Sequence, residues 1–206
     1  FDHNMKEEEF ILKIPKVELH VHLEGSVTPE FWLDLYIRHS EDNSIPSIDD
    51  LRKRFQFGSF NDFISAFRDV IFTFRTPEDF YYLTLNFLNR AADQNIRYCE
   101  VMFTPWFLEQ RGIDFYEMMS EIDRAAIEIE KKRDVKMKLI FDGPRNFGSK
   151  VVKDVFQKAL NDKTGRVIGV GLGGDEKNFP ALDFIDQFEF ARANGLKTIA
   201  HAGETD

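Results

Sequence analysis

The feature that most constrains the fold is the alternation of short β-rich runs with longer helical patterns along the 206 residues. Two of the helical patterns begin with Thr-Pro-Glu, at Thr28 and Thr76, where threonine suits the N-cap and proline the first helical position. Strands that alternate with helices pair in parallel through right-handed crossovers. The pattern therefore predicts an α/β fold. The expected strands are residues 17–23, 96–103, 136–141, 167–172 and 197–201.

Helical periodicity and end signals place the connecting helices between these runs. The second of the two Thr-Pro-Glu segments opens a helix that leads into the run at 96–103. Residues 41–58 are polar and contain proline, and no helix or strand is assigned to them. Besides the helix that follows Thr28, we expect helices over residues 61–74, 77–94, 115–133, 150–160 and 181–194.

Two architectures satisfy this order, a doubly wound sheet and a (β/α) barrel. No Gly-x-Gly-x-x-Gly turn follows the first run, whereas polar residues gather just after the end of each expected strand, which is where barrels build their active sites. A complete barrel has eight strands and about 250 residues. We therefore expect residues 1–206 to form a single domain, the first five β/α units of a TIM-type (β/α)8 barrel truncated at its C-terminal end.

Charge and composition exclude several classes of partner. The net charge of -9 disfavours nucleic acid, which needs a basic surface. No apolar run reaches the roughly 18 residues of a membrane span, and the acidic N-terminal region differs from a signal peptide. The single cysteine, Cys99, lies in an apolar run and is expected to be a core residue. These features indicate a cytoplasmic protein.

Two histidines stand one residue apart in the first expected strand. Side chains at i and i+2 of a strand point to the same face, so His20 and His22 can direct both imidazoles at one point and bind a metal ion. His201, at the end of the fifth expected strand, is the candidate third ligand. His3 and His39 are expected to be ordinary surface residues.

Glu204 lies three residues beyond His201, and Gly203 allows the backbone to turn back toward the same point. A carboxyl group beside an activated water can exchange protons with the reacting group, so Glu204 is the candidate acid. Asp142, at the end of the third expected strand, is expected to line the pocket, with a structural turn as the alternative.

Three motifs together resemble the adenosine deaminase family of zinc hydrolases. They are Pro-Lys-Val-Glu-Leu-His-Val-His-Leu-Glu-Gly at 15–25, Gly-Val-Gly-Leu-Gly-Gly-Asp-Glu at 169–176 and His-Ala-Gly-Glu at 201–204. They follow the family's order and approximate spacing over nearly the whole chain, and the family fold is a (β/α)8 barrel. The resemblance implies hydrolytic deamination of an aminopurine nucleoside or base, a small molecule, with one Zn²⁺ ion and release of ammonia.

The resemblance also implies roles for individual residues. His20, His22 and His201 would be the zinc ligands, and Glu204 would protonate the purine ring nitrogen as hydroxide attacks. The backbone of Gly174 would approach the purine, where a side chain would fill the space of the base. A segment rich in phenylalanine, including Phe57, Phe60 and Phe63, corresponds to the family's apolar lid, with core packing as the alternative for each ring.

The chain departs from adenosine deaminases proper at two positions. Glu24 stands where those enzymes usually carry an aspartate that contacts ribose, as it commonly does in adenine and aminodeoxyfutalosine deaminases, and Gly171 replaces another aspartate. The identity of the aminopurine therefore stays open. The family's later histidine and aspartate lie beyond Asp206, so a full site is expected to need the missing C-terminal half of the same protein.

Other functions remain open. One is a catalytically idle family member that binds a nucleoside or a protein partner, although the set of three histidines and one acid weighs against it. Another is a different mononuclear zinc amidohydrolase, such as one that opens a ring amide. Binuclear amidohydrolases carry a modified lysine at the end of the fourth strand, where this chain has glycine and leucine at 171–174, so a single metal ion is favoured.

Overall fold

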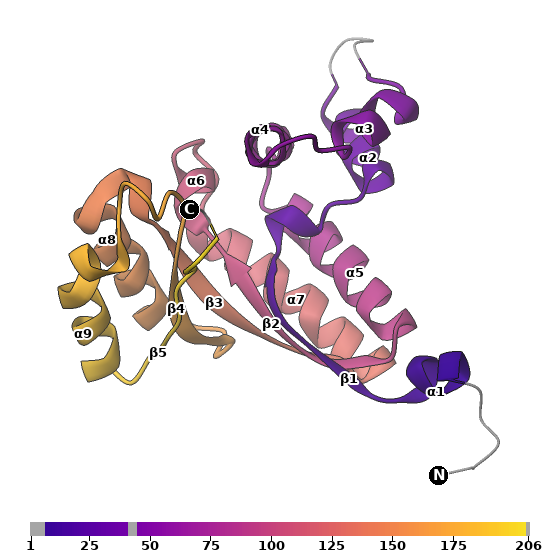
Figure 1. Cartoon of the computed structure of the whole chain (residues 1–206). Helices are drawn as coiled ribbons and strands as arrows, with labels where there is room; N and C mark the ends of the chain where they lie inside the picture. Colours follow the sequence, from indigo (N-terminus) through magenta and orange to yellow (C-terminus); the bar gives the residue numbers. More distant parts are fainter. Residues whose placement is uncertain (1–6, 41–44, 205–206) are drawn as a thin grey trace.

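The computed structural model describes residues 7–40 and 45–204, apart from the side chains of Phe60 and Asn61. Its centre is a parallel sheet of five strands that lie side by side in chain order (Figure 1). This order is the one that successive β/α units of a barrel produce, so the predicted α/β class is confirmed. The strands are β1 (Lys16–His22), β2 (Ile96–Phe103), β3 (Lys136–Pro144), β4 (Val167–Gly173) and β5 (Lys197–Thr198).

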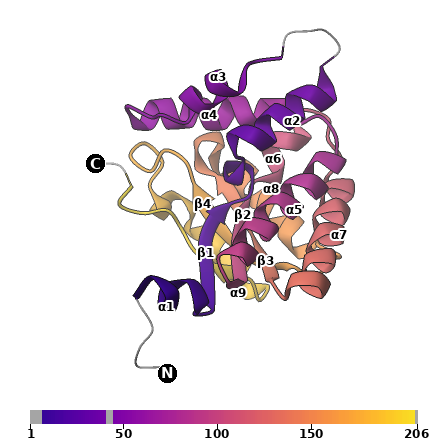
Figure 2. The ribbon, with the colours of Figure 1, turned by 90° about the vertical axis from the view of Figure 1, so that its right-hand side faces the viewer.

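The helices form two groups. Four of them, α5, α7, α8 and α9, contact the strands and cover one face of the sheet, whereas α2, α3 and α4 stand beyond the ends of the strands (Figures 1 and 2). The helices are α1 (Glu7–Lys13), α2 (Pro29–His39), α3 (Ile48–Arg54), α4 (Phe60–Thr73), α5 (Glu78–Asp93), α6 (Pro105–Glu109), α7 (Phe115–Arg133), α8 (Gly148–Leu160) and α9 (Ile185–Ala193). Short 3-10 turns are η1 (Glu24–Ser26), η2 (Arg145–Phe147) and η3 (Ala181–Phe184).

The alternation of side chains along β2 and β3 separates the core from the interior of the barrel. Every second residue belongs to the hydrophobic core beneath the helices, and the register pairs Val101 with Leu139 and Phe103 with Phe141. The residues between them, such as Ile140 and Asp142, point to the opposite face. Chemistry-bearing side chains on that face can therefore vary without disturbing the core. The core residues of the two strands are Cys99, Val101, Phe103, Met137, Leu139 and Phe141.

Four of the described helices, α2, α3, α4 and α7, begin with a side chain that caps the first turn. The Thr28 hydroxyl accepts a hydrogen bond from the Phe31 N–H at 3.2 Å, as expected. The parallel prediction for Thr76 is wrong, because the N-cap of α5 is Pro77, which offers no side-chain acceptor. Instead, the buried carboxylate of Asp79 accepts the N–H groups of Arg75 and Thr76 at 2.8 and 3.0 Å.

The observed elements differ from the expected ones in several places. The regular part of the fifth strand ends at Thr198 rather than at His201. The N–H groups of Ile199 and His201 still donate to β4 carbonyls at 3.0 and 2.9 Å, so this segment continues beside the sheet. Two helices, α1 and α3, lie in polar segments where the sequence predicted no helix. Of these, α3 is capped by Ser47 and buries only Leu51, which explains why its amphipathic signal is weak.

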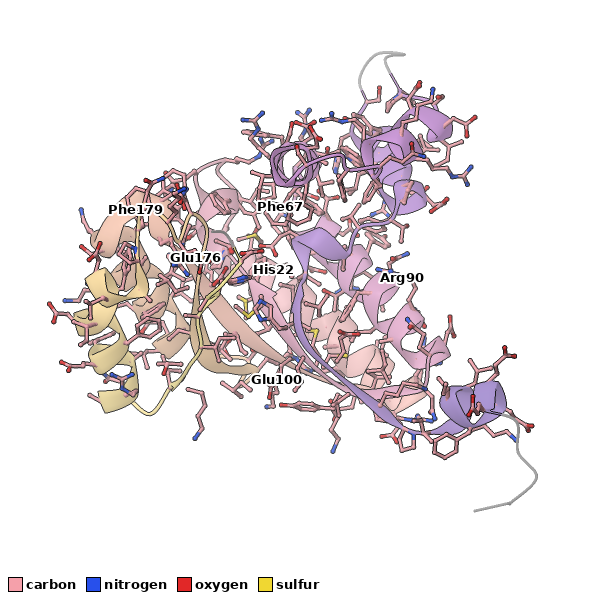
Figure 3. All side chains as sticks on the ribbon, in the orientation of Figure 1. His22, Phe67, Arg90, Glu100, Glu176 and Phe179 are labelled. Atoms are coloured by element: carbon pink, nitrogen blue, oxygen red, sulfur yellow. The ribbon has the colours of Figure 1, made fainter. Side chains whose placement is uncertain are left out.

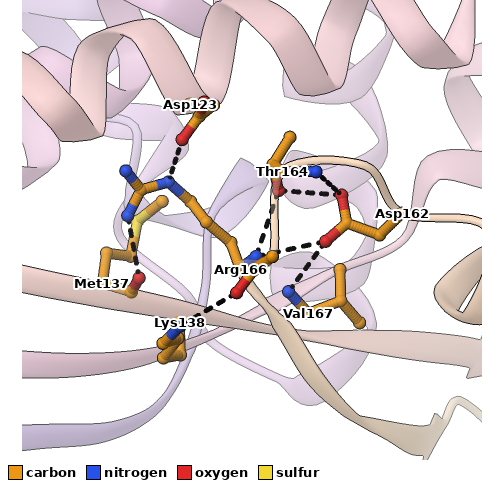
Figure 4. A network of polar contacts seen from close by, with 8 residues as sticks. Asp123, Met137, Lys138, Asp162, Thr164, Arg166 and Val167 are labelled. Carbon is orange, nitrogen blue, oxygen red and sulfur yellow. Dashed lines mark hydrogen bonds and ion pairs between the residues drawn. The ribbon is translucent and has the colours of Figure 1, made fainter.

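A polar network joins α7 to the beginnings of β3 and β4 (Figure 4). The guanidinium of Arg166 donates to the Asp123 carboxylate at 2.6 Å and to the Met137 carbonyl at 3.2 Å. The Asp162 carboxylate accepts four hydrogen bonds, from the N–H groups at 164, 166 and 167 and from the Thr164 hydroxyl. This network anchors the loop that enters β4, at the end of the sheet opposite to the histidines. Within residues 7–40 and 45–204, no helix is long and apolar enough to cross a membrane.

Candidate metal and substrate site

Three histidines converge at the carboxyl end of the sheet. The Nε2 atom of His201 lies 3.0 Å from Nε2 of His20 and 3.2 Å from Nε2 of His22. Two of these side chains come from β1 and the third from the segment that follows β5, so they meet across 181 and 179 positions of sequence. The structure thus brings together the three residues that the sequence indicated.

The backbone at His20 is not that of a regular strand. His20 has φ of 68°, in the left-handed region, and β1 takes two steps from Leu19 to Val21 while β2 takes one from Glu100 to Val101. His20 is therefore the extra residue of a β-bulge, a device that re-aims side chains beside active sites. The simple i, i+2 argument names the right residues but misses the bulge that orients one of them.

The electrostatic setting keeps the site ready for a cation. Burial, followed by the charges of His201 and His20, lowers the pKa of His22 to about 4. Burial also lowers the pKa of His201, followed by the charge of His20. Neutral imidazoles have a free lone pair for a metal ion.

The geometry fits a tetrahedral ion. With Zn–N bonds of about 2.0–2.1 Å, two ligands of a tetrahedral zinc ion stand about 3.3 Å apart. The observed separations of 3.0 and 3.2 Å are close to this value, and all three ligand atoms lie within 4.8 Å of one another. The three residues can therefore hold a metal ion at one point.

Glu204 lies on the side of the His201 ring that faces away from the point where the three histidines converge. Its Oε2 atom is 3.3 Å from Nδ1 of His201, and 41% of its side chain is exposed. Gly203 has φ of 73°, which provides the expected backward turn. A carboxylate on the second imidazole nitrogen fixes the tautomer and orientation of a histidine ligand. In this arrangement Glu204 orients His201.

Two buried carboxyl groups lie at the same end of the barrel interior. Glu24, the first residue of η1, is fully buried, and its Oε1 accepts the Thr104 N–H at 2.8 Å. Burial raises the pKa of Glu24 to about 7, opposed by that hydrogen bond. Burial raises the pKa of Asp142 to about 8, followed by the charge of Glu24 and opposed by Arg145. Glu24 Oε2 and Asp142 Oδ1 have no hydrogen-bond partner among the described residues.

Glycines of β4 make room for Asp142. A Cβ atom at Gly171 or Gly173 would collide with the Asp142 carboxyl group, so small residues are needed at both positions. Gly174 has φ of 101°, and a Cβ atom there would collide with Oδ1 of Asn146, which accepts the Asp175 N–H at 2.7 Å. Backbone conformation and this contact already require glycine at 174, whether or not a ligand approaches it.

A row of aromatic rings runs from the helical layer to the histidines. Phe67 of α4 stands edge-on over His22, with ring centroids 6.3 Å apart (Figure 3). Phe63 contacts Phe67 and also Phe57, which is 43% exposed and two rings removed from His22. The side chain of Phe60 lies outside the part of the chain that the structure describes. Phe67 is thus the described lid ring that reaches the site.

Several contacts escaped prediction, two of them beside the site and one away from it. Thr104 holds Glu24 through its backbone, which side-chain identity cannot reveal. Glu176 belongs to a recognised motif, but its contact with the turn at Glu204 depends on the fold. The surface assignment of His39 is wrong, because its Nε2 lies 2.8 Å from Oδ1 of Asp79 and only 17% of its side chain is exposed. His39 is half-buried because it is the last residue of α2, which packs beside the buried Asp79 carboxylate.

Comparison with known proteins agrees with this architecture. The profile of the family described as adenosine deaminase matches residues 15–206. An adenine deaminase of Vibrio parahaemolyticus is 34% identical over 195 residues, which cover 95% of this chain and 58% of the relative. An aminodeoxyfutalosine deaminase of Streptomyces avermitilis is 35% identical over 199 residues, covering 95% and 55%. The chain belongs to the adenosine deaminase family.

Solved structures support the same fold. The crystal structure of an adenine deaminase from Arthrobacter aurescens matches with a TM-score of 0.85 and 28% identity, over 93% of this chain and 58% of that one. A zinc-bound amidohydrolase from Burkholderia ambifaria matches with a TM-score of 0.85 at 22% identity, over 97% and 56%, which supports the fold alone. The described sheet therefore corresponds to part of a TIM-type barrel. The chain spans a little over half the length of these relatives.

Proposed function

We propose that this chain is part of a hydrolytic deaminase that removes the amino group of an aminopurine base or nucleoside as ammonia, with one zinc ion on His20, His22 and His201. The observation that carries the proposal is the convergence of the three imidazoles beside buried carboxyl groups at the mouth of the barrel. The relatives are named adenine deaminase and aminodeoxyfutalosine deaminase, which supports an adenine-like group as the reacting part of the substrate.

The chemistry divides between the ion and the protein. A zinc ion bound to three imidazoles lowers the pKa of water to about 7 and so supplies a nucleophile at neutral pH. Burial lowers the pKa of His22 and of His201, which favours the neutral imidazoles that bind a metal ion. The Glu204 carboxyl group turns from His201 Nδ1, 3.3 Å away, to the substrate and, in its protonated form, delivers its proton to the purine ring nitrogen, where negative charge builds up during attack. The 41% exposure of its side chain supports such a rotation.

The unpartnered carboxyl oxygens supply the substrate contacts. Glu24 Oε2 and Asp142 Oδ1 are buried and have no partner among the described residues, so each can accept an N–H or O–H group of the purine or its substituent. Phe67 covers the base and excludes water, whereas Phe57 stands two rings farther out. The backbone of Gly174 forms part of the pocket wall.

The rest of the barrel comes from the C-terminal half of the same protein. Within the described residues, β1 and β5 form the two edges of the sheet, and the apolar side chains of Val17 and Leu19 on β1 are 63% and 56% exposed. Open edges and exposed apolar strand residues are a liability that further strands remove. A stable, monomeric and active protein made of residues 1–206 alone would contradict this part of the proposal.

The test of the proposed function uses the full-length protein with zinc. Loss of ultraviolet absorbance and release of ammonia are followed with adenine, adenosine and aminodeoxyfutalosine in parallel, for wild type and for Glu204→Gln. Conversion of one compound, with kcat lowered by about 100-fold or more in the variant, is expected, because general acid catalysis contributes about 10²- to 10⁴-fold. Silence on all three with one zinc ion bound favours a different amidohydrolase substrate or an idle binding protein.

A further inference from the structure

The backbone from His201 to Glu204 is held by two charged side chains from the segments that follow β3 and β4. On one side, the guanidinium of Arg145 donates to the His201 carbonyl at 2.7 Å and to the Leu172 carbonyl at 3.1 Å. On the other side, the carboxylate of Glu176 accepts the N–H groups of Gly203 at 3.0 Å and Glu204 at 2.6 Å. A cation thus binds a carbonyl and an anion binds two amides of the same short segment.

This segment needs an external support. The regular strand β5 ends at Thr198, and the last hydrogen bond to β4 is the one from the His201 N–H to the Leu172 carbonyl. Beyond that bond, the positions of Gly203 and Glu204 depend on Glu176, and Gly203 itself adds conformational freedom. Hydrogen bonds to charged groups are about twice as strong as neutral ones, which suits them to this task.

Arg145 is itself fixed. It is 1% exposed, and it also donates to the Phe179 carbonyl at 3.2 Å, so it joins the ends of β3, β4 and β5. Burial lowers the pKa of Arg145, while the charge of Glu176 opposes that effect. Glu176 therefore stabilises the charged state of Arg145 at the barrel mouth.

We propose that Arg145 and Glu176 form a clamp that positions the third histidine and the acid of the site, His201 and Glu204. The two clamp residues are positioning residues, because they touch the backbone of the functional residues. Arg145 sets His201 through its carbonyl, and Glu176 sets the turn that aims the Glu204 carboxyl group. This proposal rests on the proposed function for its catalytic consequence, but the clamp itself is a property of this chain.

The test compares Glu176→Ala, Glu176→Gln and Arg145→Lys in the full-length protein with Glu128→Gln, which alters a glutamate on the surface of α7. In Glu176→Ala we expect kcat to fall about 10- to 100-fold with KM changed less than about 3-fold, since small misplacement of a catalytic group costs up to about 100-fold. Glu176→Gln keeps one acceptor oxygen and should recover part of that loss. Arg145→Lys keeps the charge but not the fork of donors, and should lower kcat and metal affinity together.

A second readout separates this clamp from the proposed function. Hydrogen exchange of a peptide covering residues 199–204 should be faster in Glu176→Ala than in wild type and unchanged in Glu128→Gln. Unchanged exchange and unchanged kcat in Glu176→Ala would overturn the clamp, as would a loss of kcat fully explained by lost metal or unfolding. If wild type deaminates no purine, the proposed function fails, and the exchange rates still decide whether the clamp exists.

Discussion

The two ends of the sheet differ in whether their buried polar groups have hydrogen-bond partners within the protein. At the end where β3 and β4 begin, Arg166 and Asp162 are tied to protein partners through the network of Figure 4. At the mouth, Glu24 Oε2, Asp142 Oδ1 and Arg145 Nε have no hydrogen-bond partner among the described residues. Unpaired buried groups cost free energy, so their concentration beside three converging imidazoles indicates a place kept for ligands. The polar groups of one end are satisfied within the protein, and those of the other are left open to a ligand.

The largest expected effect comes from the histidines at the mouth. His22→Ala in the full-length protein should lose its metal ion and at least about 1,000-fold in kcat/KM, because the activated nucleophile depends on the ion. His39→Gln is the matched control, since His39 pairs with Asp79 away from the site. Metal analysis and steady-state kinetics check the result. Equal metal content in both variants would contradict the assignment of the ligands.

The opposite end should respond in stability and not in activity. Arg166→Met leaves Asp123 without its 2.6 Å partner and should lower the free energy of unfolding by about 2–3 kcal/mol, less than a fully buried pair because 26% of the Asp123 side chain is exposed. Arg97→Met removes an exposed pair and should cost less than about 0.5 kcal/mol. Urea unfolding and kcat of both variants test the contrast. A large fall in kcat for Arg166→Met at unchanged KM would contradict the claim that this end of the sheet affects stability alone.

The buried Asp142 should leave a signature in the pH dependence of stability. The pKa of Asp142 is raised to about 8, so the folded state keeps a proton that the unfolded state loses near pH 4. The stabilisation is complete below pH 4 and is lost as pH rises through 8. Asp142→Asn should therefore gain about 4 kcal/mol relative to wild type between pH 5 and pH 8, because these three pH units lie between the two pKa values and each is worth about 1.4 kcal/mol. Urea unfolding of the two metal-free full-length proteins measures this difference in the free energy of unfolding at each pH. A difference that stays constant from pH 5 to pH 8 would contradict the raised pKa of Asp142.

The smallest effect distinguishes two rings of the lid. Phe67 lies beside His22, whereas Phe57 is two rings away and 43% exposed. Phe67→Ala should raise KM by about 5- to 10-fold, as expected for about 1 kcal/mol of lost contact, and Phe57→Ala by less than about 2-fold. Steady-state kinetics compares the two variants on whichever of adenine, adenosine and aminodeoxyfutalosine the wild-type protein converts. The reverse order would mean that the lid closes with a different ring over the base.

The sequence alone predicts which residues meet at the mouth of the barrel better than it predicts the backbone that holds them. Alternation of strands and helices indicated the parallel sheet, and the strand-end positions of His20, His22 and His201 indicated that these side chains converge, because both signals are local. The bulge at His20 and the support of Glu24 by the Thr104 N–H were not predicted. Both depend on register and backbone geometry, which residue identity does not encode position by position.

Packing between distant segments explains the remaining errors. The α3 helix was missed because it buries one residue and owes its start to the Ser47 cap. The contact between His39 and Asp79 joins residues 40 positions apart, so neither neighbourhood predicts it. Phe67 reaches His22 only because α4 stands beyond the ends of the strands. These are tertiary effects that local patterns cannot supply.

The most direct test of the central claim, a single-metal site at the mouth of the barrel, is the metal stoichiometry of the full-length protein. The purified protein is stripped with a chelator and titrated with Co²⁺ while its visible absorption is recorded. One equivalent per chain, lost in both His20→Ala and His201→Ala, is the expected result. Two equivalents per chain, or a single equivalent that both variants retain, would contradict the assignment of His20, His22 and His201 as the ligands of one ion.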